Sequence, residues 1–389
     1  MTNEVNNKKG TSFVTFLHQK RAQIRGIDFA LALLIFILAF SQVILVLTNL
    51  LIPSLVQLEA YSQEQEVNKH FSNVFLTQGT PTSWGTIPTD VLPEFKLGLQ
   101  NTHGLLDFTK INRLVSGVSS YWAIDYVSVK ISYSMIKDFV IEITSPINIE
   151  INSMEVFYSY IEVKGEVLEY YTSIEGANIW AFAIDSENQV STNSTTTKNI
   201  DDSIAFSVAI PIDAADYYVV AIIAEVGGIY QDYEVKHLER VGFPLDFEYR
   251  DFDIIPFIQE NDDSPSSAID VSYNKLSIED EVSATVVFPF EGLDVQYFQQ
   301  DMILIDVPEE GDIYQALNVP VPSSGFAVVI ITEQTSSDYR VGYIGIPMLL
   351  SPEHGGYYGA TDKLAQTTIS MNQMITIRDI LVKCQIWYG

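Results

Sequence analysis

The feature that most constrains this chain is an apolar stretch from Ile27 to Leu55, in which the only charged residue is Asp28. A helix of that length is about 43 Å long, against a membrane hydrocarbon core of about 30 Å. The stretch can therefore cross a membrane. It is longer than the apolar part of an ordinary secretory signal, and no small-residue cleavage site follows it, so ordinary signal cleavage is not expected.

The distribution of charge predicts how such a helix is oriented. Five of the 21 basic residues and one of the 50 acidic residues precede Ile27, so the rest of the chain carries 16 − 49 = −33. The positive-inside rule then places the N-terminus in the cytoplasm and the bulk of the chain outside the cell. A surface this acidic repels nucleic acid and anionic lipid headgroups, so we expect no nucleic-acid partner.

Two interpretations of the N-terminal region remain open. One is an uncleaved signal-anchor in a single-pass membrane protein. The other comes from Arg25-Gly26, directly before the long apolar helix, because this arrangement resembles the class III signal peptide of archaeal type IV pilins and pilin-like proteins. In that family a prepilin-type peptidase cuts after the glycine on the cytoplasmic side. The resemblance implies a cut between Gly26 and Ile27, which leaves 363 residues (389 − 26).

The membrane helix is predicted to continue as an amphipathic stalk. Residues Val56 to Leu76 contain no glycine or proline, and their apolar residues recur at helical spacing. Pro53 is expected to kink the helix. Beyond the stalk, Gly79 and Pro81 are expected to turn the chain, with Trp84 as a packing residue in that turn.

A short helix is predicted in the segment LDFTKINRL, residues 106–114, with Asp107 or Thr109 as its cap. Together with the preceding turn, this block also resembles archaeal class III-signal proteins. The matching residues are Gly79, Pro81, Trp84, Leu97, Gly98, Leu99, Leu106, Asp107, Lys110 and Leu114. The chain's end, MITIRDILVKCQIWYG, resembles the closing strand of such proteins.

From Tyr121 onward the sequence predicts repeated short strands, rich in β-branched and aromatic residues and separated by polar turns. Strands without intervening helices favour antiparallel β-sandwich domains. The segment from Val163 to Pro211 resembles small Ig-like or transthyretin-like exterior modules, and this resemblance implies a fold type and no activity.

The expected domain organisation follows from these segments. The ranges are a basic leader at 1–26, a transmembrane helix and stalk at 27–76, a connecting region with a short helix at 77–120, a β-sandwich domain at 121–255, an acidic linker at 256–272 and a second β-rich domain at 273–389.

No motif in the sequence predicts catalysis, a metal site or a cofactor. The five histidines are scattered singly, which excludes a zincin helix, and the chain has neither a Gly-x-Ser-x-Gly elbow nor a phosphate-binding loop. Cys384 is the single cysteine, so no intrachain disulfide and no thiolate metal site can form. Glu353 and His354 are interpreted as part of an exposed turn rather than a functional loop.

One modification site is predicted. Asn193 begins the sequon Asn-Ser-Thr in what is expected to be a polar turn on the exterior side, where N-glycosylation is plausible. The acidic clusters at 199–203 and 260–270 lack the spacing of a calcium-binding loop and are interpreted as solvated linkers.

The leading hypothesis is a non-enzymatic, membrane-anchored cell-surface protein of the archaeal type IV pilin-like class, as a minor or accessory subunit. Its expected partners are membrane lipid, a prepilin-type peptidase and like helices in a filament or assembly complex, with exterior β domains for adhesion or assembly contacts. The alternatives are an unprocessed single-pass receptor or adhesin, whose exterior ligand the sequence does not identify, and an anchored exterior hydrolase.

Overall fold

The structure is a computed structural model. It describes residues 9–92, 94–115, 122–135, 137–200, 202–215, 217–239, 248–251, 257–260, 268–274, 281–289, 295–307, 311–322, 324–334, 338–354, 356–360 and 369–388. The chain divides into two compact units, Met1–Glu66 and Val67–Gly389, and each unit is described by itself.

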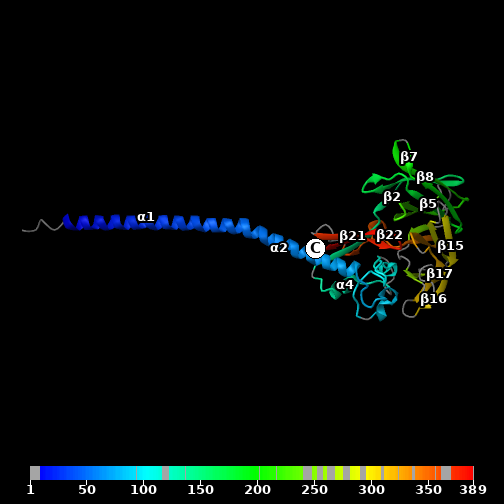
Figure 1. The fold of residues 1–389 in the computed structure, drawn as a ribbon, viewed down its shortest axis with the longest axis horizontal. Coiled ribbons are helices and arrows are strands. Elements are labelled where there is room, and N and C mark those ends of the chain that lie inside the picture. Colours follow the sequence, from blue (N-terminus) through cyan, green and yellow to red (C-terminus); the bar gives the residue numbers. More distant parts are fainter. Residues whose placement is uncertain are drawn as a thin grey trace, which may run out of the picture. The chain divides into compact units, whose positions relative to one another are not determined.

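The first unit is helical wherever it is described. Helix α1 spans Lys9–Val46, a π-helical segment η1 spans Leu47–Leu51, and α2 runs from Ile52 to Phe75 (Figure 1). The π-helical segment ends two residues before Pro53, which has no backbone N–H to donate and whose ring disturbs the regular hydrogen-bond ladder of the preceding turn. The predicted continuation of the apolar helix into a stalk is confirmed. Every side chain from Gly26 to Tyr61 is exposed, and this helix is long and apolar enough to cross a membrane.

The second unit begins with the end of α2, where Val67, Phe71 and Val74 are buried. A segment that we call the junction, residues 77–135, follows. Its helical elements are η2 (Trp84–Thr86), η3 (Thr89–Val91), α3 (Phe108–Asn112) and α4 (Tyr126–Ser132). The predicted short helix and its cap are confirmed, because the Asp107 side chain accepts a hydrogen bond from the backbone N–H of Thr109.

Helix α4 shows that one sequence prediction is wrong, because residues 121–135 were expected to form a strand. In a strand Val127, Val129 and Ile131 would share one face. In the structure Val129 is buried, whereas Val127 and Ile131 are exposed. The side chain of Asp125 caps the helix by accepting a hydrogen bond from the N–H of Ser128 at 2.8 Å. This local cap outweighs the β-propensity of the valines and isoleucine.

The rest of the unit is built from strands. The first ten are β1 (Phe139–Thr144), β2 (Ile147–Val156), β3 (Tyr160–Glu169), β4 (Thr172–Ser173), β5 (Asn178–Asp185), β6 (Val190–Thr196), β7 (Lys198–Ile200), β8 (Ser203–Pro211), β9 (Tyr217–Val226) and β10 (Tyr230–Glu239). The others are β11 (Glu248–Asp251), β12 (Phe257–Glu260), β13 (Ala268–Asn274), β14 (Glu281–Pro289), β15 (Val295–Asp301), β16 (Ile303–Val307), β17 (Gly311–Pro320), β18 (Ala327–Gln334), β19 (Asp338–Ile346), β20 (Tyr358–Gly359), β21 (Ile369–Ile377) and β22 (Ile380–Tyr388), with a 3-10 turn η4 (Pro352–His354) before β20.

These strands form five sheets. Their orders are β20-β1-β22-β21, β10-β9-β5-β6, β11-β19-β18-β14-β15, β12-β13-β17-β16 and β2-β3-β8-β7, with β4 paired to β3. Among the described strands the pairing is antiparallel, except that β11 and β19 run parallel. The predicted fold class, an apolar helix followed by antiparallel sheets consistent with β-sandwich packing, is confirmed.

The sheet that contains β5 and β9 is covered on both faces. Its alternate residues belong to two different buried clusters. In β5 the first set is Ile179, Ala181 and Ala183, and the second set is Trp180, Phe182 and Ile184. The first set packs with the β2-β3-β8 sheet as a sandwich, and the second set joins the core that contains β14 and β18. Continuous burial explains why these strands read as unbroken apolar runs.

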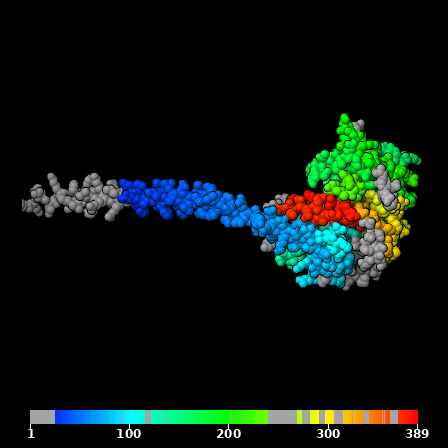
Figure 2. Space-filling view, viewed as in Figure 1, coloured from blue at the N-terminus to red at the C-terminus, as the bar shows by residue number. Residues whose placement is uncertain are grey.

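The C-terminal segment forms a hairpin, whereas the sequence analysis treated it as one closing strand. Strands β21 and β22 pair through a turn at Arg378 and Asp379, whose φ angles are 47° and 67°. Residues Lys383 to Tyr388 of β22 then pair with the whole of β1. Figure 2 shows the C-terminal residues (red) between the green sandwich residues and the cyan residues of the junction. The end of the chain therefore contributes to the centre of this unit.

The range that was expected to be an acidic linker, 256–272, contributes strands β12 and β13, which pair with each other. Residues 261–267 of that range lie outside the described residues. The predicted domain boundaries remain predictions.

Candidate functional site

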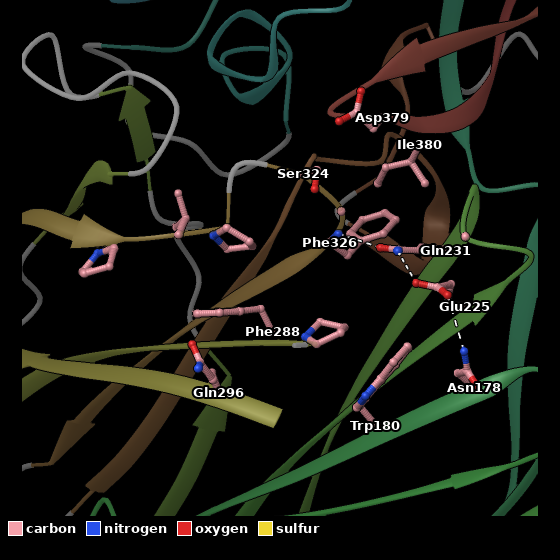
Figure 3. A pocket seen from close by; sticks show the side chains of 16 residues that line it. Asn178, Trp180, Glu225, Gln231, Phe288, Gln296, Ser324, Phe326, Asp379 and Ile380 are labelled. Atoms are coloured by element: carbon pink, nitrogen blue, oxygen red, sulfur yellow. Dashed lines mark hydrogen bonds between the residues drawn. The ribbon is translucent and has the colours of Figure 1, made fainter. Parts of the chain in front are cut away.

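One cleft in the β region has a volume of about 970 Å³ and lies where three parts of that region converge. The first is the β5-β9-β10 sheet, and the second is the pair of strands β14 and β15. The third consists of the end of β17 and the described residues that follow it, 320–322 and 324–326, together with the β21–β22 turn. Figure 3 shows this cleft with its lining side chains. We call it the central cleft. Its volume lies in the usual range for small-molecule sites.

The apolar part of the central cleft consists of three buried aromatic side chains from three different elements. Trp180 comes from β5, Phe288 from β14, and Phe326 directly precedes β18. Their exposed fractions are 2%, 8% and 1%. The alternation of β5 directs Trp180 away from the sandwich core and toward this side of the sheet. The floor of the cleft is therefore apolar and firmly packed.

A chain of hydrogen bonds crosses one side of the cleft (Figure 3). The Asn178 amide donates to Glu225 Oε1 at 3.4 Å, and the Gln231 amide donates to Glu225 Oε2 at 2.9 Å. The backbone N–H of Phe326 donates to Gln231 Oε1 at 2.6 Å. Both ends of the Gln231 amide are thus engaged, which fixes the orientation of the Glu225 carboxylate.

The described residues at the rim of the central cleft are polar and include no basic side chain. Gln296, Ser324 and Asp379 line it and are exposed. Among the described residues that line the cleft, the charged side chains are the carboxylates Glu225 and Asp379, and none is Lys, Arg or His. The cleft can therefore offer amide donors, carboxylate acceptors and apolar surface.

A second, smaller cleft of about 230 Å³ lies beside His354. His354 Nε2 is 2.8 Å from the carbonyl oxygen of Tyr233 and 3.5 Å from Asp232 Oδ1. Because a carbonyl only accepts, Nε2 carries the proton of this bond. His354 Nδ1 is 2.9 Å from the Ser351 hydroxyl. The earlier interpretation of an exposed turn is wrong here, since Ser351 is 2% exposed and the His354 side chain 7% exposed.

This serine, histidine and aspartate arrangement has a structural explanation. Ser351 directly precedes η4, and its contact with His354 spans one turn, where the N–H of His354 also donates to the Ser351 carbonyl at 3.0 Å. The Asp232 carboxylate accepts from the N–H of Ile149 at 3.1 Å. Burial raises the pKa of Asp232 to about 7. The cluster thus fastens the turn before β20 to β10 and β2.

Within the described residues, no group of three or more His, Cys, Asp or Glu is placed to hold a metal ion.

The residues predicted for processing lie on helix α1. Arg25, Gly26 and Ile27 are all helical, and Ile27 is 60% exposed. A Cβ added at Gly26 would meet nothing within 4 Å. Packing therefore does not require glycine at this position. The predicted cut between Gly26 and Ile27 remains a prediction.

The residues predicted to form the turn after the stalk lie close together in the junction. Trp84 is fully buried and its indole N–H donates to the Gly98 carbonyl at 3.0 Å. Gly79 has a φ of +73°, and a Cβ there would lie 2.4 Å from the Lys96 carbonyl oxygen. Only glycine fits such a position without strain. Pro81 follows Gly79 in the same turn and is partly buried.

Sequence reasoning missed a pair of buried cations beside Trp84. Arg113 and Lys110 are each 1% exposed, and their charged groups lie 5.6 and 5.9 Å from the Trp84 ring centre. We call Lys110 and Arg113 the cation cluster. Both residues lie in the segment that the sequence predicts as a short helix, so their position on a helix could be expected. Their partners are distant in sequence, and only the fold brings them together.

The predicted glycosylation site lies on a strand rather than in a turn. Asn193 belongs to β6 and is exposed, and its amide donates to the Ala209 carbonyl at 2.6 Å. N-glycosylation replaces one of the two amide hydrogens, so the other can keep this bond. The exposure is compatible with the prediction, which remains untested.

Comparisons with known proteins add little. No family model and no curated protein matches this chain. One similar solved structure is described as a tetra-tandem repeat in the extending region of a large adhesion protein, with 12% identity and a TM-score of 0.21. The match covers 52% of this chain and 49% of the other, so the chain spans about half the length of that structure. A likeness this slight assigns neither a family nor a function.

Proposed function

We propose that this protein is a non-enzymatic, membrane-anchored surface protein whose β region faces the exterior. One observation carries the proposal. The apolar side chains between Ile27 and Leu58 are all exposed. So long an exposed apolar helix is unfavourable in water and favourable in lipid, where a helix also satisfies its own backbone hydrogen bonds.

The proposed orientation places the N-terminus in the cytoplasm. Basic residues precede the helix, and the chain from Ile27 onward carries a net charge of −33 (16 − 49). This asymmetry follows the positive-inside rule. The single buried cysteine, Cys384, needs no disulfide, because the β region has extensive buried cores of its own.

Within this class we propose a minor or accessory archaeal type IV pilin-like subunit. Arg25-Gly26 before the apolar helix supports this assignment, as does the turn at Gly79, Pro81 and Trp84. In this proposal a prepilin-type peptidase removes residues 1–26. The exposed helix then packs with like helices in a filament or assembly complex, and the β region makes adhesion or assembly contacts.

The first experiment determines the N-terminus of the native protein, extracted from membranes with detergent, by mass spectrometry. We expect a chain that begins at Ile27. A Gly26→Val variant should remain uncut, because the helix tolerates a side chain there while the peptidase does not. The matched control is Ala30→Val, at another exposed helical position, and it should be processed normally.

A native chain that begins at Met1 or Thr2 would reject pilin-type processing and favour the second candidate, an unprocessed single-pass receptor or adhesin. The central cleft is the observation that favours this candidate. Release of the protein from membranes by alkaline carbonate would reject both candidates, because a spanning helix resists that treatment.

The non-enzymatic assignment is part of the proposal and is tested separately. Ser351 is buried, and the N–H groups of His354 and Gly356 both donate to the Ser351 carbonyl, so neither of these two groups is free to stabilise an oxyanion. A broad screen with ester, peptide and glycoside substrates should show no turnover that His354→Gln abolishes. Turnover that depends on His354 would reject the non-enzymatic assignment and support the hydrolase hypothesis.

A further inference from the structure

We propose that the central cleft binds a neutral saccharide. This inference rests on the proposed function in one respect, since the cleft meets such ligands only if the β region faces the exterior. It names a ligand class for contacts that the proposed function leaves unspecified. Four properties of the cleft support it.

The first property is charge. The described lining residues include two carboxylates, Glu225 and Asp379, and no basic side chain. An anionic ligand such as a phosphate or a sulfated glycan would find no positive partner there and would be repelled. The cleft therefore suits a neutral or cationic ligand.

The second property is the fixed polar network. Glu225 receives hydrogen bonds from Asn178 at 3.4 Å and Gln231 at 2.9 Å, so amide donors already partly offset its charge. A cation would have to compete with these donors. A hydroxyl both donates and accepts, so adjacent sugar hydroxyls can pair with a carboxylate oxygen and a neighbouring amide together. A network held in place in the free protein also lowers the entropic cost of binding.

The third property is the apolar floor. Trp180, Phe288 and Phe326 form the floor, and proline rings at positions 289, 320 and 322 contribute to the walls. Sugars present apolar C–H faces as well as hydroxyls, which matches a cleft that combines aromatic rings with isolated polar groups. An extended peptide would instead add to a sheet edge through backbone hydrogen bonds. Proline has no N–H to donate, so these walls are poor templates for an added strand.

The fourth property is an unused donor. The Trp180 indole N–H has no hydrogen-bond partner among the described residues. A buried donor without an acceptor is destabilising. A ligand hydroxyl or a water that it holds could accept from this group. The cleft thus offers one more donor to a neutral, oxygen-rich ligand.

The test uses the full chain in detergent micelles and an immobilised array of neutral oligosaccharides of glucose, mannose, galactose and N-acetylglucosamine. We expect binding to at least one of these probes, with an affinity then measured by calorimetry. Gln296→Ala and Asp379→Asn should each weaken that affinity about tenfold, because a hydrogen bond to the ligand contributes about 1.4 kcal/mol.

Two matched controls separate the cleft from general surface effects. Gln373→Ala removes an exposed glutamine on β21 that does not line the cleft, and Asp202→Asn changes an exposed aspartate whose φ of +68° matches that of Asp379. Neither should change the affinity. Binding should also alter the tryptophan fluorescence of the wild-type chain, and Trp180→Phe should abolish that change.

Three results would overturn the inference. They are no binding to any neutral probe, equal effects of the cleft variants and their controls, and preferential binding of tetramethylammonium or heparin, the cationic and anionic comparison ligands. The N-terminal measurement is independent of all three. A chain that begins at Ile27 but binds no saccharide would overturn the cleft assignment alone, whereas saccharide binding by a chain that begins at Met1 would overturn pilin processing alone.

Discussion

Two buried charged groups in the same unit are satisfied to different degrees. In the cation cluster, Arg113 donates to the carbonyls of Trp84, Ile87 and Trp122 and to the Thr89 hydroxyl. In the cluster of Ser351, His354 and Asp232, which we call the His354 cluster, Asp232 Oδ1 has no hydrogen bond among the described residues and lies 3.5 Å from His354 Nε2. The Arg113 guanidinium therefore has several hydrogen-bond acceptors, whereas one oxygen of the Asp232 carboxylate has no donor among the described residues.

The difference shows what the backbone can provide inside a β-rich core. Lys110 donates to the carbonyls of Gln78 and Gln100, so peptide dipoles stabilise both buried cations. Burial lowers the pKa of Arg113 to about 10 and lowers that of Lys110 while Asp107 opposes the shift, yet Arg113 stays charged at neutral pH. The Asp232 carboxylate has fewer hydrogen bonds than the Arg113 guanidinium. Its raised pKa of about 7 brings its titration into the physiological range.

The largest effect is expected when the cation cluster loses its guanidinium. Arg113→Met would remove the guanidinium hydrogen bonds to the carbonyls of Trp84, Ile87 and Trp122 and to the Thr89 hydroxyl. We expect the free energy of unfolding to fall by about 3–5 kcal/mol. Urea unfolding of the full chain in detergent micelles, followed by tryptophan fluorescence, measures this change. Arg113→Lys keeps the positive charge but has fewer N–H donors. Its free energy of unfolding should lie between those of the wild type and Arg113→Met. A loss below about 1 kcal/mol would show that the cluster contributes little.

The second prediction concerns pH and the Asp232 carboxylate. Its pKa is about 7 in the folded chain against 3.8 for an ordinary aspartate, so between these values the folded state holds a proton that the unfolded state has released. Its stabilising contribution is therefore present below about pH 4 and is lost as pH rises through 7, by at most about 4 kcal/mol.

Asp232→Asn tests this dependence, because the amide oxygen can still accept from the N–H of Ile149 without titrating. From pH 5 to pH 8 the wild type should lose more stability than the variant, by about 2–4 kcal/mol. The control is Asp213→Asn at an exposed position, which should follow the wild type. Parallel pH profiles for wild type and Asp232→Asn would reject the assignment.

A third, smaller effect separates the cap from the charge at the cation cluster. Asp107 caps α3 and its other oxygen lies 3.6 Å from the Lys110 ammonium. Asp107→Asn keeps a capping oxygen and removes the ion pair, so we expect a loss of about 1 kcal/mol. Asp107→Ala removes both and should cost about 2 kcal/mol. Equal losses for the two variants would mean that the cap contributes nothing beyond the charge.

The smallest effect is expected for an ion pair that water reaches. Lys130 lies 2.5 Å from Asp138, and their side chains are 25% and 33% exposed. Lys130→Met should reduce stability by less than about 1 kcal/mol, and high salt should reduce the wild-type stability by a similar amount. A loss as large as that of Arg113→Met would break the contrast between buried and exposed charges.

Some elements could be predicted because their causes are local. The apolar helix follows from composition alone, and the Asp107 cap follows from a short polar residue before a helical pattern. The apolar runs of β5 and β9 indicated strands correctly, and their lack of alternation fits a sheet that is covered on both faces. Helix α4 was missed because the spacing of Val127, Val129 and Ile131 imitates a strand.

The parts of the candidate site could not be predicted, because they come from distant segments. Asn178, Glu225 and Gln231 lie on three strands, and Phe326 belongs to another sheet region. His354 was interpreted as exposed because its local sequence, Gly-rich and polar, resembles a surface turn. Its burial depends on the Tyr233 carbonyl and Asp232, more than a hundred residues away.

The sequence by itself determined that this chain has an apolar helix able to span a membrane, an acidic β region and no recognisable catalytic motif. These properties depend on composition and on neighbours within a few residues, so each can be read locally. The tertiary structure alone decided which polar groups are buried, which of them receive hydrogen bonds, and where Trp180, Phe288 and Phe326 meet to form the central cleft. Burial and hydrogen bonding depend on strand pairing between distant segments, and that pairing is a property of the whole fold.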